Sequence, residues 1–195
     1  AGSDTLRIHP GDYMIGYGAT GTEACSRDYP WDCAMAAVPP GRPGAPTRIL
    51  GTDAAGACVR KPQLWGTERV ARVLDLRGSS HVELVCLEIT DRAACIEHHR
   101  DPAIRCKRDR HPFGPWASTG VVASDARDVR LEHLDIHGLA NRGVMAGRLT
   151  DWTVRDVRIA ANGWAGWDGD IGADSANAGT LRFQRWTVEW NGCAA

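Results

Sequence analysis

Apolar residues recur through the second half of the chain in short alternating runs. Residues 120–137, 143–160 and 172–189 align without a gap, and residues 73–90 form a fourth copy of the same pattern. Each copy has apolar residues at positions i, i+2, i+5 and i+7, which is typical of two short β-strands separated by a bend rather than of a helix. The aligned columns are Val82/Val129/Trp152/Leu181, Leu84/Leu131/Val154/Phe183, Leu87/Leu134/Val157/Trp186 and Ile89/Ile136/Ile159/Val188.

The spacing of the copies predicts an all-β solenoid with a coil of about 23 residues, interrupted by insertions at about 91–118 and 163–171. A coil of this size holding three short strands fits a right-handed parallel β-helix. No coil of such a fold buries its apolar face alone, so the stacking of coils supplies the core. We therefore expect one β-helix domain over 1–195, with irregular opening coils over 1–72 and regular coils over 73–195.

Aligned residues of stacked coils are expected to form ladders, because adjacent coils lie about 4.8 Å apart. Asn162 and Asn191 align after the last apolar column, where stacked amides can bond along the stack. Asp174 aligns with Asp75, Val122 and Met145, so in this register it is expected to point inward. The bend ladder is Cys86/His133/Asp156/Arg185, and an outward ladder is Glu88/Asp135/Arg158/Thr187, in which the opposite charges of Asp135 and Arg158 are neighbours.

Composition narrows the function classes. The 195 residues carry a net charge of −1, which gives no footprint for nucleic acid and no polybasic membrane anchor. No apolar run reaches the roughly 18 residues of a transmembrane helix. Seven cysteines indicate an oxidising compartment, so we expect a secreted, periplasmic or extracellular protein.

The cysteines are expected to form three disulfides that close loops or join coils. Cys193 is left over at the end of a coil, so either one thiol is free or its partner lies elsewhere. We take it to mark an incomplete stack: a fragment, a processed piece or a β-helix that a second chain continues. For Cys95 and Cys106 the alternative to a disulfide is a zinc site formed together with His98 and His99. The expected pairs are Cys25–Cys33, Cys58–Cys86 and Cys95–Cys106.

The segment 163–174 concentrates candidate chemistry. Paired carboxylates divide into general acid and base or nucleophile in glycoside cleavage, and Trp faces stack on sugar rings. In a second interpretation Asp168 and Asp170 bind Ca²⁺. In a third the aspartates cap turns and the tryptophans cover the side of the stack. The candidate catalytic residues are Asp168, Asp170 and Asp174, and the candidate sugar-binding residues are Trp164 and Trp167.

A second candidate site follows the strand at 135–137. His137 shares its outward face with Asp135, which makes it a candidate base, acid or ligand. Arg142 and Arg148 can hold a uronate carboxylate bidentately, and Asn141 lies beside them. The alternative is that His137 is simply a solvated surface histidine.

Three segments carry a family resemblance. DTLRIHPGDY at 4–13, GAPTRILG at 44–51 and VLDLRGSSHVELVCLEIT at 73–90 resemble the opening of secreted right-handed β-helix proteins of the pectate-lyase-like superfamily, which includes alginate and chondroitin lyase relatives. The resemblance implies an extracellular protein that acts on, or binds, a polysaccharide in a groove along an outer strand face. Related lyases use Lys or Arg as the base, but Lys61 and Lys107 lie in loops.

Two hypotheses therefore stand for the function. The first is a polysaccharide-cleaving enzyme, either a lyase or a glycoside hydrolase. The second is a non-catalytic module that binds carbohydrate or serves as a surface or scaffold element, since this kind of fold hosts both.

Overall fold

The chain folds into β-strands that form three sheets, each with all of its strands parallel. The computed structural model describes residues 3–16, 36–67, 70–107, 116–169 and 176–192, and these segments contain no helix. The first sheet has the order β1 (Thr5–Arg7), β3 (Thr47–Leu50), β6 (Ser80–Val85), β9 (Arg127–Glu132), β12 (Thr150–Arg155) and β15 (Ala178–Gln184). The second has β2 (Asp12–Gly16), β4 (Gln63–Thr67), β7 (Glu88–Asp91), β10 (Asp135–His137), β13 (Arg158–Ala160) and β16 (Thr187–Glu189). The third has β5 (Val70–Asp75), β8 (Ala117–Ser124), β11 (Arg142–Gly147) and β14 (Ala165–Asp168).

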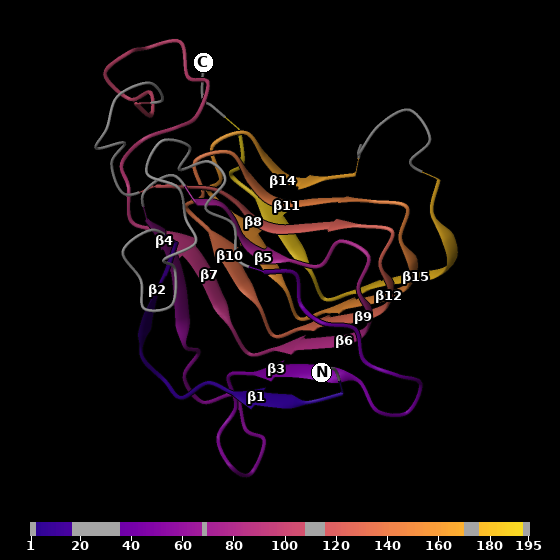
Figure 1. Cartoon of the computed structure of the whole chain (residues 1–195). Coiled ribbons are helices and arrows are strands. Elements are labelled where there is room, and N and C mark those ends of the chain that lie inside the picture. Colours follow the sequence, from indigo (N-terminus) through magenta and orange to yellow (C-terminus); the bar gives the residue numbers. More distant parts are fainter. Residues whose placement is uncertain (1–2, 17–35, 68–69, 108–115, 170–175, 193–195) are drawn as a thin grey trace.

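From β6 onward the chain visits the three sheets in turn, and each strand pairs with the strand of the preceding layer (Figure 1). In the first sheet Val82 pairs with Val129, Val129 with Trp152, and Trp152 with Leu181. These are the pairs that the aligned repeats predict. The arrangement is consistent with a parallel β-helix or another parallel solenoid.

The bend between the first and second sheets is made by one residue in the left-handed region. Cys86, His133, Asp156 and Arg185 have φ between 47° and 59°. Such a φ reverses the local curvature of the backbone, so one residue is enough to turn the chain from one sheet to the next. The four residues of the predicted bend ladder thus form the corner between the first and second sheets in successive layers.

The core lies inside the three sheets. Leu84, Leu131 and Val154 of the first sheet are fully buried, as are Ile89, Ile136 and Ile159 of the second. The predicted amide stack is also present, because Nδ2 of Asn162 donates to Oδ1 of Asn191 over 2.8 Å. Oδ1 of Asn162 accepts from the amide of Leu139 over 3.1 Å.

The third sheet corrects the alignment of the repeats. The sequence aligns Gly172 with Gly143 and treats 163–171 as an inserted loop, but residues 165–168 form β14, with Arg142 paired to Ala165 and Val144 to Trp167. Gly166 therefore stands beside Gly143. Asp168, and not Asp174, pairs with Met145 and so continues the column of Val122 and Asp75.

Two of the three expected disulfides are present. Cys58 bonds to Cys86, and Cys95 bonds to Cys106 within the segment between β7 and β8. The Cys95–Cys106 bond contradicts the zinc alternative, because it consumes both thiolate ligands. Cys25, Cys33 and Cys193 lie outside the described residues.

The two disulfides indicate an oxidising environment. In the described part of the chain there is no helix with the length and apolarity needed to cross a membrane.

The last layer exposes residues that belong to the core in earlier layers. Phe183, Trp186 and Val188 are 38%, 37% and 43% exposed. Their counterparts one layer earlier, Val154, Val157 and Ile159, are at most 2% exposed. This face is the end of the stack, because β15 and β16 are the outermost strands of their sheets.

Candidate functional site

A cavity of about 460 Å³ lies where the segment between β7 and β8 meets the third sheet. It is lined by Glu97, His98, Arg142 and Trp164. Its size is within the range of about 300–1,000 Å³ that encloses small ligands.

The stacking of layers explains why these residues meet. Arg142 is the first residue of β11 and pairs with Ala165 of β14, and the amide of Trp164 donates to the carbonyl of Asn141 over 2.7 Å. The amide of Glu97 donates to the carbonyl of Ala140 over 2.7 Å. Three segments far apart in sequence are therefore held together by backbone hydrogen bonds.

Arg142 is held in place from two directions. Its Nε donates to Oδ2 of Asp168 over 2.5 Å, and both side chains are largely shielded from solvent. Its Cζ lies 4.1 Å from the centre of the Trp164 ring, in a cation–π contact. Trp164 is nevertheless 54% exposed, so it offers an open aromatic surface beside a fixed guanidinium.

Glu97 is a buried carboxylate at the same cavity. Its Oε2 accepts hydrogen bonds from Oγ of Ser118 over 2.6 Å and from Nδ2 of Asn141 over 3.2 Å. Its Oε1 lies 3.7 Å from Nε2 of His98. A buried carboxylate that is fixed by two donors is oriented for proton transfer.

Two further features lie beside the Glu97 carboxylate. Oδ1 of Asn141 is buried and has no hydrogen-bond partner among the residues that the structure describes. His98 has a φ of 67°, in the left-handed region that the corner residues of this chain also adopt.

Glu97 is the residue that the sequence analysis missed. A single Glu in a Cys-rich insertion belongs to no recognisable sequence motif. Its position at the cavity depends on hydrogen bonds from Ser118 and Asn141, which are distant in sequence. The disulfide Cys95–Cys106, which was predicted, fixes the segment that carries Glu97 and was the only available hint.

The structure brings together four of the predicted site residues: Asn141, Arg142, Trp164 and Asp168. The other two predicted aspartates, Asp170 and Asp174, lie outside the described residues.

Three other predicted residues, His137, Arg148 and Trp167, make their contacts away from this cavity. Nε2 of His137 lies 2.9 Å from Oε1 of Glu88, and its Nδ1 lies 3.3 Å from Oγ1 of Thr90, both on the second sheet. Arg148 forms a two-pronged ion pair with Asp125 at a corner, over 2.6 and 2.7 Å.

Trp167 packs against the core instead of offering a binding surface. Its ring makes edge contacts with Trp152, Phe183 and Trp186, at centroid distances of 6.4, 5.5 and 5.9 Å. The physical reason is the register, because Trp167 pairs with the inward-facing Val144. This packing leaves less of the Trp167 ring face open for the predicted sugar stacking.

Of the two predicted Ca²⁺ ligands the structure describes only Asp168, and its carboxylate is paired with Arg142. Asp168 already has the Arg142 guanidinium as its cation, and a second positive charge there is disfavoured. Within the described segments no three His, Cys, Asp or Glu side chains are arranged to hold a metal ion.

Comparisons with protein-family models, with curated proteins and with solved structures give no match.

Proposed function

We propose that the chain is a right-handed parallel β-helix with a basic coil of about 23 residues, similar to the pectate-lyase-like superfamily. The hydrogen bond from Arg155 to Glu132 supports this coil length, because it joins neighbouring layers across 23 positions of sequence. The resemblance of the opening segments supports the family.

We propose that the protein is secreted and cleaves a polysaccharide at the cavity lined by Glu97, His98, Arg142 and Trp164. The observation that carries this proposal is the placement of the buried Glu97 carboxylate beside the exposed Trp164 ring. An aromatic face binds a sugar ring by stacking, and a fixed carboxylate transfers the proton that cleavage requires.

Each residue has a distinct role in this proposal. In hydrolysis Glu97 donates a proton to the glycosidic oxygen as its bond to the anomeric carbon breaks, and the water that adds to this carbon returns a proton to Glu97. In elimination Glu97 takes the proton from the carbon next to the uronate carboxylate and passes it to the leaving oxygen as the C=C bond forms. Ser118 and Asn141 keep Oε2 of Glu97 in place. Trp164 stacks on the sugar, and Arg142 donates hydrogen bonds to its hydroxyl or carboxylate oxygens. Asp168 orients Arg142.

The test is incubation with a panel of acidic and neutral polysaccharides, with two readouts. Reducing ends without ultraviolet absorbance indicate a hydrolase, and unsaturated uronate absorbance indicates a lyase. We expect Trp164→Ala to weaken glycan binding by about 1–3 kcal/mol. Arg148→Gln is the matched surface control, because Arg148 pairs with Asp125 away from the cavity.

Glycan binding that is unchanged in Trp164→Ala, together with no cleavage of any polysaccharide, would contradict this proposal. The non-catalytic alternative would then apply. The observation that favours that alternative is the exposed apolar face of the last layer, which a second chain continuing the stack would cover.

A further inference from the structure

The two oxygens of the Glu97 carboxylate have different surroundings. Oε2 accepts hydrogen bonds from Ser118 and Asn141 over 2.6 and 3.2 Å, whereas Oε1 lies 3.7 Å from Nε2 of His98. Cleavage moves a proton at two places: the glycosidic oxygen and the attacking water in hydrolysis, or a carbon and the leaving oxygen in elimination. A second group beside Oε1 can carry the proton between these two places.

A β-turn brings the side chains of Glu97 and His98 to the same cavity. The amide of His99 donates to the carbonyl of Ile96 over 3.4 Å, and Glu97 and His98 are the two central residues of this turn. His98 has a left-handed φ of 67°, which some β-turns require at their third residue. In an extended strand successive side chains point to opposite faces, whereas here both residues line one cavity.

The turn is held in place by the fold around it. The amide of Glu97 donates to the carbonyl of Ala140 over 2.7 Å, and the disulfide of the same segment closes it. A Cβ at Gly163 would lie 2.9 Å from Cγ2 of Ile96, so the turn packs directly against the chain that leads into β14. The backbone of the turn is therefore fixed.

Among the residues that line this cavity, His98 is suited to pass on a proton near neutral pH. Its side chain is 54% exposed, against 6% for Glu97. The charged side chains that share the cavity with His98 are Glu97 of the same turn and Arg142 of β11, which is paired with Asp168 of β14. A guanidinium keeps its protons, and the indole of Trp164 is a donor only, whereas an imidazole gains and loses a proton. An exposed side chain changes rotamer within nanoseconds, so Nε2 can approach Oε1 more closely than 3.7 Å.

We propose that His98 relays the proton between Oε1 of Glu97 and the second reacting oxygen. This inference rests on the proposed cleavage at this cavity. In hydrolysis the lone pair on Nε2 of neutral His98 takes a proton from the water as its oxygen bonds to the anomeric carbon. Nε2 then gives this proton to Oε1 of Glu97, which has lost its own proton to the glycosidic oxygen. In elimination the proton that Glu97 took from carbon passes through Nε2 to the leaving oxygen, while the C–H electron pair forms the C=C bond and the C–O pair leaves with the oxygen.

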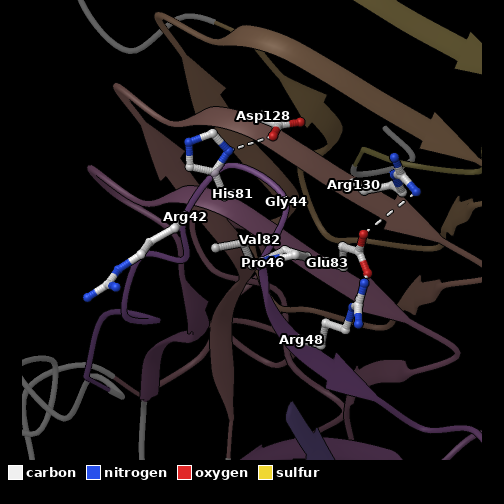
Figure 2. Close-up of a pocket in the computed structure, with 9 residues that line it drawn as sticks. All are labelled: Arg42, Gly44, Pro46, Arg48, His81, Val82, Glu83, Asp128 and Arg130. Atoms are coloured by element: carbon white, nitrogen blue, oxygen red, sulfur yellow. Dashed lines mark hydrogen bonds and ion pairs between the residues drawn. The ribbon is translucent and has the colours of Figure 1, made fainter. Parts of the chain in front are cut away.

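A second histidine, His81, lines a different cavity and serves as a comparison. This cavity of about 230 Å³ lies on the outer side of the first sheet, and Figure 2 shows the residues that line it. Nδ1 of His81 lies 2.6 Å from Oδ2 of Asp128, whose side chain is 60% exposed. The described residues that line this cavity include no Trp, Tyr or Phe. A sugar ring has no stacking surface beside His81, so we assign it no part in cleavage.

The test is the pH dependence of kcat/KM in His98→Asn, on the polysaccharide that the wild type cleaves fastest. Asn adopts a left-handed φ more readily than most residues, so the turn should be retained. We expect kcat/KM to fall about 10²- to 10⁴-fold, with binding of the same polysaccharide unchanged. The acidic limb of the profile should lose the part that comes from protonation of an imidazole, because neutral His98 is the form that relays. A residue that only supports the fold would not change the shape of the profile.

His81→Asn and His99→Asn are the matched controls. His81 also has a left-handed φ, and His99 lies in the same segment as His98 without lining the cavity. Both variants should keep the wild-type rate and pH profile. His98→Gln gives the same comparison if His98→Asn fails to fold. A wild type that cleaves, with His98→Asn equal to the controls, would overturn the relay alone. A wild type that cleaves no polysaccharide would overturn the proposed function and the relay with it.

Discussion

The carboxylates of this chain owe their different roles to their surroundings. Asp168 is neutralised by Arg142, and Glu97 is held by two neutral donors. Asp91 is a third case. It is buried at the end of β7 and accepts hydrogen bonds from the amides of Ala93 and Ala117 over 3.1 and 2.8 Å. Burial raises the pKa of Asp91 to about 7, although these amide bonds oppose the rise.

Asp91 predicts a pH dependence of stability. The folded pKa is about 7, and an unfolded Asp has a pKa of about 3.9. Between these values the folded chain keeps a proton that the unfolded chain has released. The stabilisation from this group is therefore complete below about pH 4 and is lost as the pH rises through about 7. Denaturant unfolding at a series of pH values measures this slope.

Asp91→Asn is the variant that isolates the effect. Nδ2 of the introduced Asn would face one of the two backbone amides that now donate to Asp91. Two donors cannot bond to each other, so we expect the free energy of unfolding to fall by about 1–3 kcal/mol. The variant should also lack the slope between pH 4 and 7. The same slope in the variant and the wild type would show that other groups cause it.

In the third sheet the backbones of neighbouring strands approach so closely at Gly143 that no side chain fits there. A Cβ at Gly143 would lie 2.8 Å from the carbonyl oxygen of Gly166 and 2.5 Å from Cγ2 of Ile159. We expect Gly143→Ala to lower the free energy of unfolding by about 1–3 kcal/mol, since β11 would have to move. Gly169→Ala is the control, because the nearest atom to its Cβ would be 3.9 Å away. Thermal unfolding compares the two, and equal stability would contradict the predicted crowding.

The first and second sheets could be predicted from the sequence, because their apolar columns alternate regularly. Trp152 and Leu181 pair as the repeats predict, although the repeats there are separated by extra residues. β14 was missed because Ala165 and Gly166 give no apolar alternation, and a later Gly fitted the repeat equally well. The same shift misplaced Trp167, and Asp168 takes the position beside Met145 that the alignment gave to Asp174. The site was predicted in part: Arg142, Trp164 and Asp168 came from the pattern, whereas Glu97 depends on the folding of an insertion.

At the scale of the whole molecule, the last layer leaves apolar side chains exposed to water. We expect this exposed apolar face to drive association of the chain with itself in solution, because otherwise Phe183, Trp186 and Val188 stay in water. Light scattering across a range of concentrations measures the mass. We expect an assembly larger than one chain, and Trp186→Lys should dissociate it.

A matched control for the assembly is Val59→Lys. Val59 is 84% exposed and lies away from the last layer, next to the disulfide-bonded Cys58. This variant should leave the mass unchanged. A stable single chain at all concentrations would contradict the predicted association.

We propose that a polysaccharide is cleaved at the cavity of Glu97 and Trp164. The most direct test is the cleavage rate of wild type and Glu97→Gln on the polysaccharide that binds best. Gln keeps the shape of Glu97 and cannot transfer its proton, so we predict a rate about 10²- to 10⁴-fold lower with glycan binding retained. Equal cleavage rates in the two proteins, measured with both correctly folded, would contradict the account.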